Sequence, residues 1–297
     1  MYIELFGRGD RLGANITCFI AQILYAYHNN IFIKYDRKNI LSCDNVCFVP
    51  YDQKYNSSIF IETLFDFIDD YNTKLPGEIG EKIEIASIHF FEMISKILLT
   101  IKTDYFSYFK QNIYPLIIEN FMKKSIDKNY TIMFDPKKTI LVHLRLNDVR
   151  KSPDYDGRIC ANHFNITINN DQIADNNISH QIQSTTFCNI QAPLSKGKLQ
   201  TQINIALEKH PDYEVIIITS PNEDTSFLPY RYIQSNDESY DLFLLCNSEV
   251  VILSRSTFAL CSLLFGIVKD AYVPLWGHIS CFGLSNKYDN SKYNYFY

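Results

Sequence analysis

Residues 139–146 read Thr-Ile-Leu-Val-His-Leu-Arg-Leu, a nearly continuous apolar run that carries two basic side chains. Such a run is typical of a strand that is covered on both faces. Residues 215–219 (Val-Ile-Ile-Ile-Thr) and 250–253 (Val-Val-Ile-Leu) have the same character, and a last short strand is predicted at 271–275. These runs indicate the core of a sheet in the second half of the chain.

Helical patterns lie between these strands, at 196–209, 239–247 and 257–265, and Gly266 is placed to end the last of them. Strands that alternate with helices predict a parallel sheet. Residues 152–195 are polar, rich in asparagine and without periodicity, and they are expected to form a long loop.

The first half of the chain starts with a short apolar segment, residues 2–6, and a turn-prone stretch from Gly7 to Gly13. A helix is then predicted because apolar residues recur at helical spacing, namely Ile16, Phe19, Ile20, Ile23, Leu24 and Tyr27. Residues 31–35 resemble the next strand, and 59–125 are mainly helical, with Pro115 at a helix start. We therefore expect an α/β protein with two Rossmann-like domains, 1–135 and 136–297, facing a cleft.

Composition excludes several classes of protein. Hydrophobic residues make up 46% and charged residues 21%, values close to the globular average. The net charge is -5 and no run of five Lys or Arg occurs, so a nucleic-acid partner is not expected. No stretch of 18 apolar residues predicts a membrane span, and residues 1–10 lack a secretory pattern, which favours a cytoplasmic location.

The strongest candidate for chemistry is the segment 143–148, His-Leu-Arg-Leu-Asn-Asp, which directly follows the first buried strand. Ligands of open α/β sheets bind at the carboxyl ends of strands, and the guanidinium of Arg145 matches a diphosphate. His143 and Arg145 alternate along the strand, so they share a face. An ion pair between Arg145 and Asp148 that only fixes the turn is the alternative interpretation.

A second candidate segment, Ser-Arg-Ser-Thr-Phe at 254–258, joins a strand to an apolar helix. Hydroxyl groups and backbone N–H groups at a helix N-terminus form an anion site. An ordinary N-cap is the alternative, because Ser and Thr supply caps frequently.

A third candidate is the glycine-containing stretch before the first helix. Gly7, Gly9 and Gly13 would permit close approach of a ligand, but their spacing is not a dinucleotide fingerprint. Asp36 is the nearest acidic residue at the distance that such a fingerprint requires.

Two short segments have the residue types of a metal site. Asp154 and Asp156 form a D-x-D pair that could hold Mg²⁺ or Mn²⁺ against a diphosphate, although a solvated loop is the default interpretation. Cys43 and Cys47 have a zinc-like spacing without a second pair, and reduced thiols are the expected state of the eight cysteines. No resident metal or cofactor is predicted.

Taken in order, these segments resemble the α-1,2-, α-1,6- and protein O-fucosyltransferases. That family carries an H-x-R-x-x-D motif after a strand, which residues 143–148 match, and later an S-x-S-[ST]-F type motif, which 254–258 match. Between them come a strand ending in Thr219 and the acidic-aromatic stretch 239–242. The resemblance implies a GT-B-like fold and a metal-independent, inverting transfer of fucose from GDP-fucose to a glycan hydroxyl.

The resemblance also implies roles on the nucleotide side. Arg145 would neutralise the β-phosphate of the leaving GDP, and Ser256 and Thr257 would donate hydrogen bonds to the same diphosphate. His143 and Asp148 would shape the nucleotide pocket. The family's motif further makes Ser254 and Phe258 candidate substrate-binding residues.

On the opposite side of the predicted cleft, the resemblance implies that the loop residues Arg11, Gly13 and Asn15 face the donor sugar. A carboxylate is needed to take the acceptor proton, and Asp10 is the candidate. Domain 1–135 would then be the acceptor side and domain 136–297 the nucleotide-sugar side.

The sequence departs from the family at several positions. Leu146 and Asn147 stand where the family often has Arg and Gly. Ala14 stands where the family often has Asn, so Asn15 is displaced by one position. Two alternatives therefore stay open: a polysaccharide pyruvyl- or other sugar-modifying transferase, and a non-catalytic carbohydrate-binding protein on a transferase scaffold.

Overall fold

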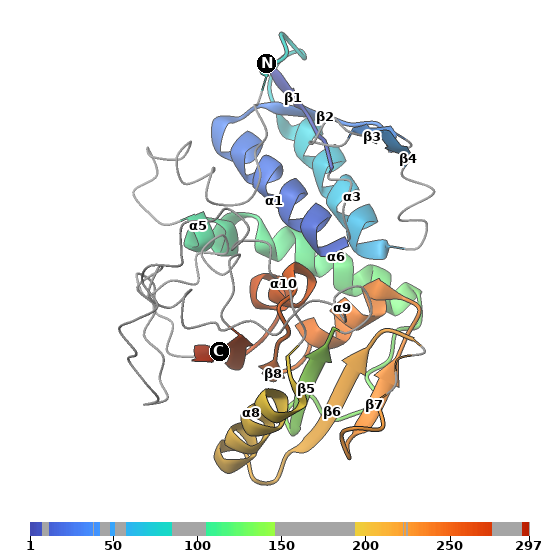
Figure 1. Ribbon diagram of the computed structural model, residues 1–297. Helices are drawn as coiled ribbons and strands as arrows, with labels where there is room; N and C mark the ends of the chain where they lie inside the picture. Colours follow the sequence, from blue (N-terminus) through green and yellow to red (C-terminus); the bar gives the residue numbers. More distant parts are fainter. Residues whose placement is uncertain are drawn as a thin grey trace, which may run out of the picture. The chain divides into compact units, whose positions relative to one another are not determined.

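The computed structural model spans the whole chain and describes residues 1–7, 12–37, 39–41, 48–50, 58–84, 105–145, 194–221, 223, 225–274 and 293–296 (Figure 1). The chain divides into two compact units. Unit 1 comprises Met1–Thr131 and Asp237–Ser239, and unit 2 comprises Ile132–Asn236 and Tyr240–Tyr297. The cleft and the roles assigned above to domains 1–135 and 136–297 stay predictions.

Unit 2 is built on a six-stranded sheet in which every neighbouring pair of strands is parallel. Its strands lie in the order β10-β9-β8-β5-β6-β7. Numbered along the chain, this is the order 3-2-1-4-5-6 of doubly wound nucleotide-binding folds. The strands are β5 (Thr139–Leu144), β6 (Glu214–Thr219), β7 (Arg231–Gln234), β8 (Val250–Ile252), β9 (Asp270–Pro274) and β10 (Tyr293–Phe296).

The central strands are apolar because both faces of the sheet are buried. Ile140 and Val142 of β5 belong to a core cluster that includes Leu199 and Ile203 of α8 (Lys196–Lys209). The intervening Leu141 is also fully buried, on the other face of the pleat. The predicted parallel sheet with two covered faces is thus confirmed for unit 2.

Two strands of this sheet were not predicted. β7 reads Arg-Tyr-Ile-Gln, and only Ile233 is buried, because β7 is an edge strand beside β6. The strand expected at 271–275 corresponds to β9, but it is not the last strand, since β10 pairs with it in parallel. β7 was missed because a strand with a single buried residue shows no apolar run.

Helix α10 (Thr257–Phe265) ends at Gly266 as predicted, for a steric reason. A Cβ atom on Gly266 would lie 2.4 Å from the carbonyl oxygen of Ser262 and 3.0 Å from that of Cys246. Cys246 is the last residue of α9 (Glu238–Cys246), so the bare Cα of Gly266 allows α10 to end against α9.

Unit 1 pairs a small parallel sheet with long helices. β1 (Tyr2–Glu4) pairs in parallel with β2 (Phe32–Lys34), and α1 (Leu12–Asn29) connects them. The antiparallel pair β3 (Asn39–Leu41) and β4 (Phe48–Pro50) was not predicted. The other helices that the structure describes in unit 1 are α3 (Ile59–Lys74), α5 (Tyr105–Asn112) and α6 (Tyr114–Asp127).

Two buried or half-buried amides fix these elements to each other. Gln22 of α1 accepts from the N–H of Phe6 at 3.0 Å and donates to its carbonyl at 2.7 Å. Asn72 of α3 does the same for Ile33 of β2, at 2.9 and 2.7 Å. Each amide therefore satisfies a backbone donor and acceptor that would otherwise be left without hydrogen bonds.

Helices α3 and α6 pack against each other through aromatic rings. Phe60 and Phe121 are fully buried and meet edge to face, with ring centroids 4.9 Å apart. Pro115 lies in the first turn of α6, as the sequence predicts, because that turn has no use for its missing N–H. None of the described helices is long and apolar enough to cross a membrane.

Candidate functional site

The candidate site lies where the doubly wound sheet reverses its direction of growth. From β5 the chain builds outward through β6 to β7, and it then returns to place β8 on the other side of β5. Ligands of such sheets bind beyond the carboxyl ends of the strands at this switch point. The two sequence segments singled out above lie at the ends of these two strands: His143 is the penultimate residue of β5, Arg145 directly follows β5, and residues 254–258 follow β8.

Strand pairing brings the two segments together. Val142 lies opposite Ile252 in the register of β5 and β8. One residue further along β5, Nδ1 of His143 lies 2.6 Å from Oγ of Ser254, a distance typical of a hydrogen bond. The His143 ring also packs against Phe258, with centroids 5.7 Å apart. The predicted candidate His143 thus contacts both Ser254 and Phe258.

His143 is a neutral imidazole at ordinary pH. Burial, and then the positive charge of Arg145, lower the pKa of His143 to about 3. His143 is therefore a neutral group that positions the hydroxyl of Ser254, and Arg145 places a positive charge beside it. The positive charge of Arg145 favours an anion over a cation at this edge of the sheet.

The N-terminus of α10 supplies hydrogen-bond donors at the same place. Ser256 is the N-cap, its side chain makes no capping hydrogen bond, and Thr257 begins the helix. Both side chains are more than nine-tenths buried. Two such hydroxyls beside the positive end of a helix dipole can bind an anion.

Arg145 reaches across to the loop between β8 and α10. Its Nη1 lies 3.5 Å from the backbone carbonyl oxygen of Arg255, a long hydrogen bond that aims the guanidinium at the α10 side of the site. Arg255 itself is 1% exposed and was not among the predicted site residues. Its position between Ser254 and Ser256 was the only sequence signal for it, because an arginine in a loop is ordinarily exposed.

The remaining predicted site residues are Asp148 and those of the glycine-containing stretch before α1. Asp10, Arg11 and Asp148 lie outside the described residues. Gly13 and Asn15 were predicted in a loop, but the structure places both inside α1, which begins at Leu12, and both are buried. The reason is that the apolar helical pattern extends further toward the N-terminus than the glycines suggest.

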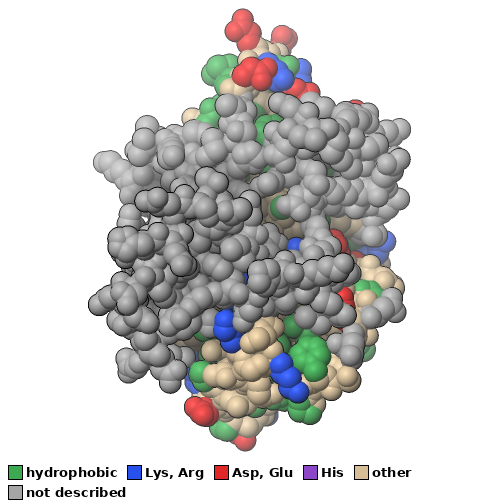
Figure 2. All heavy atoms as spheres, viewed as in Figure 1, with side chains coloured by type: hydrophobic (Ala, Val, Ile, Leu, Met, Phe, Trp, Pro, Cys, Tyr) green, Lys and Arg blue, Asp and Glu red, His purple; other side chains and the backbone are tan. Residues whose placement is uncertain are grey.

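Within the described residues, no group of three or more His, Cys, Asp and Glu side chains gathers in a way that could hold a metal ion. The residues of the two possible metal sites in the sequence, Asp154 with Asp156 and Cys43 with Cys47, lie outside those residues. On the visible face, basic and acidic side chains of the described residues are scattered and do not merge into one basic stripe (Figure 2).

No protein-family model and no curated protein sequence matches the chain. Among solved structures, the crystal structure of POFUT1 in complex with GDP aligns with 99% of this chain and 98% of that chain, at 10% identity and a TM-score of 0.39. POFUT1 in complex with GDP-fucose aligns over 89% and 92%, with the same identity and TM-score. Similarity at this level does not establish a common fold.

Proposed function

We propose that the chain is an inverting, metal-independent glycosyltransferase that moves fucose from GDP-fucose to a glycan hydroxyl. One observation carries the proposal: at the switch point of a doubly wound sheet, Arg145 and the N-terminus of α10 gather around the neutral His143. Such an arrangement suits a diphosphate. The ordered resemblance of segments 143–148 and 254–258 to fucosyltransferase motifs supports the choice of GDP-fucose.

In this proposal, the residues of unit 2 act on the leaving group. The acceptor oxygen forms a bond to the anomeric carbon while the bond from that carbon to the β-phosphate oxygen breaks, and negative charge develops on GDP. Arg145 stabilises this charge, and the hydroxyls of Ser256 and Thr257 donate hydrogen bonds to it. His143 holds Ser254 in place, and Asp148 completes the nucleotide pocket.

The acceptor proton goes to a carboxylate, and we propose Asp10 for this role. Arg11, Gly13 and Asn15 are proposed to bind the donor sugar. These four assignments rest on the sequence resemblance, with Asp10 chosen because a general base must be an ionised group of suitable strength. Variants of Asp10 test the proposed base separately from the site at β5 and β8.

The proposal is tested by release of GDP from GDP-fucose, measured by chromatography with and without a mixture of glycan acceptors. We expect GDP release by the purified chain that persists in EDTA. Arg145→Ala should lower the rate about 100-fold or more, since one lost donor to a developing oxyanion costs about 3 kcal/mol. Lys196→Ala, at the exposed start of α8, is the matched control for loss of a positive charge.

Two outcomes would overturn the proposal. Release from UDP-sugars that requires a divalent ion would assign the chemistry to Asp154 and Asp156 instead. Transfer from phosphoenolpyruvate to a glycan, without use of any nucleotide sugar, would favour a pyruvyltransferase.

A further inference from the structure

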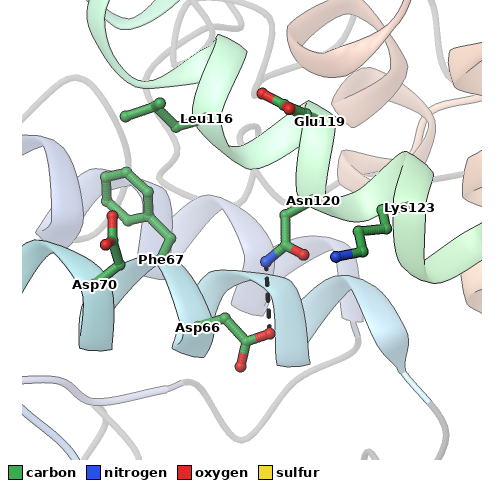
Figure 3. A pocket seen from close by; sticks show the side chains of 7 residues that line it. All are labelled: Asp66, Phe67, Asp70, Leu116, Glu119, Asn120 and Lys123. Atoms are coloured by element: carbon green, nitrogen blue, oxygen red, sulfur yellow. Dashed lines mark hydrogen bonds between the residues drawn. The ribbon is translucent and has the colours of Figure 1, made fainter.

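Unit 1 contains a groove that the proposed nucleotide site does not use. It lies between α3 and α6 and encloses a cavity of about 250 Å³ (Figure 3). This volume is just below the usual range of small-molecule sites, so it suits one small residue of a ligand. Both walls belong to the same compact unit, so the groove is defined within unit 1.

One end of the groove is apolar. Figure 3 shows Leu116 of α6 and Phe67 of α3 toward this end, with Asp70 beside them. Leu116 is 46% exposed, which is high for a leucine that lines a concave surface. An apolar wall next to a carboxylate can receive a ligand that has a C–H face and a hydroxyl edge.

The other end of the groove is polar and partly fixed. Asp66 accepts from Nζ of Lys124 at 2.7 Å and lies 3.5 Å from Nη2 of Arg37. Nδ2 of Asn120 is 3.5 Å from the same carboxylate, as Figure 3 shows. The Asp66 carboxylate is therefore held in place and largely neutralised, while its remaining acceptor capacity faces the groove.

Glu119 and Lys123 complete the lining, one turn apart on α6. In the part of the chain that the structure describes, neither side chain forms an ion pair or a hydrogen bond. They add one acceptor and one donor of opposite charge. Asp70 is paired with Lys74, so the groove as a whole is close to electrically neutral.

From this lining we propose that the α3–α6 groove binds a neutral carbohydrate. Sugar hydroxyls both donate and accept hydrogen bonds, which matches the carboxylates of Asp66 and Glu119 together with the donors of Asn120 and Lys123. The near balance of charge disfavours a polybasic or polyphosphate ligand. The groove is a site separate from the one at β5 and β8, and it does not depend on the function proposed there.

The test uses the full chain and three neutral disaccharide probes: chitobiose, lactose and mannobiose. Binding is measured by saturation-transfer NMR and by titration calorimetry, without nucleotide. We expect at least one probe to bind with a millimolar dissociation constant. The double variant Glu119→Ala, Asn120→Ala should weaken that binding about tenfold or more. Asp127→Ala, which removes an exposed carboxylate at the end of α6, should leave it unchanged.

Two further arms separate this inference from the nucleotide site. Arg145→Ala should leave disaccharide binding intact, and the Glu119 and Asn120 variant should leave binding of GDP intact. The inference is overturned if no probe binds up to about 10 mM. It is also overturned if the groove variant binds as well as the parent, if only a lysine-rich peptide binds, or if Arg145→Ala abolishes disaccharide binding.

Discussion

The strands of the six-stranded sheet all begin on one side, here called the amino edge, and end on the opposite side, the carboxyl edge. The polar groups at these two edges are used in opposite ways. At the amino edge, Asp270 of β9 has a side chain that is 6% exposed. Its carboxylate accepts from Nζ of Lys209 at 2.8 Å, from Nε2 of His210 at 2.9 Å and from Nδ2 of Asn294 at 2.6 Å. At the carboxyl edge, Ser256 and Thr257 are buried at the N-terminus of α10, and the side chain of the N-cap Ser256 makes no capping hydrogen bond.

The comparison separates a stabilising cluster from a binding site. A buried carboxylate with three donors contributes to folding, and nothing is left to bind a ligand. A helix N-terminus whose N-cap side chain makes no hydrogen bond leaves N–H groups that a ligand or water can satisfy. The amino edge is therefore expected to control stability, and the carboxyl edge is expected to control ligand affinity.

The largest expected effect is on the carboxyl edge. Arg145→Ala should lower donor turnover about 100- to 1000-fold while the free energy of unfolding of the ligand-free protein changes little, because Arg145 is only half-buried. Initial rates and denaturant unfolding check the two parts. Arg145→Lys, which keeps the charge but loses the fork, should recover only part of the rate. Full activity in Arg145→Ala would remove Arg145 from the site.

The converse is expected at the amino edge. Burial alone would raise the pKa of Asp270, but hydrogen bonds from Lys209, His210 and Asn294 outweigh it and lower that pKa. Asp270→Asn should therefore reduce the free energy of unfolding by about 2–3 kcal/mol, since it leaves the donors without their charge partner. Chemical denaturation measures the loss. Binding of GDP by the folded variant should be unchanged, and weakened binding would mean that the two edges are coupled.

Gly266 tests whether the end of α10 is set by steric contact. Gly266→Ala should cost about 2 kcal/mol, because the new Cβ would clash with two backbone oxygens that cannot move independently. Gly197→Ala, in the first turn of α8, is the matched control. No atom lies within 4 Å of its added Cβ, so it should be neutral or stabilise by about 0.5 kcal/mol. Equal effects in the two variants, seen by thermal unfolding, would contradict the steric account.

The smallest predicted effect comes from His143. Its pKa is about 3 in the folded chain against 6.5 in an unfolded one, so the unfolded chain takes up the proton first as the pH falls. The free energy of unfolding should fall by roughly 1 kcal/mol from about pH 7 to about pH 5.5 on this account. His143→Gln should lose this part of the pH dependence. If the slopes of parent and variant coincide, His143 is not buried as a neutral group.

Much of unit 2 could be predicted from the sequence because its strands are continuous apolar runs. The helix at 196–209 coincides with α8, and 139–146 contains β5. The polar edge strand β7 escaped detection because a strand with one buried residue has no apolar pattern. In unit 1, the start of α1 was placed too late because Gly13 was interpreted as part of a turn.

The candidate site could be predicted only in part. The sequence identified both segments, but it could not show that Oγ of Ser254 meets Nδ1 of His143 across 111 positions of the chain. That contact depends on β8 returning to the side of β5 away from β6, a choice made by the packing of the whole sheet. Burial of Arg255 and the neutral state of His143 follow from the same packing.

The most direct test of the carboxyl-edge site is a thermal-shift measurement with GDP, UDP, CDP and ADP, each with and without EDTA. A ligand that binds only the folded state raises the melting temperature. The account predicts selective stabilisation by GDP that survives EDTA and is lost in Arg145→Ala. Stabilisation by UDP that requires a divalent ion and persists in Arg145→Ala would contradict it.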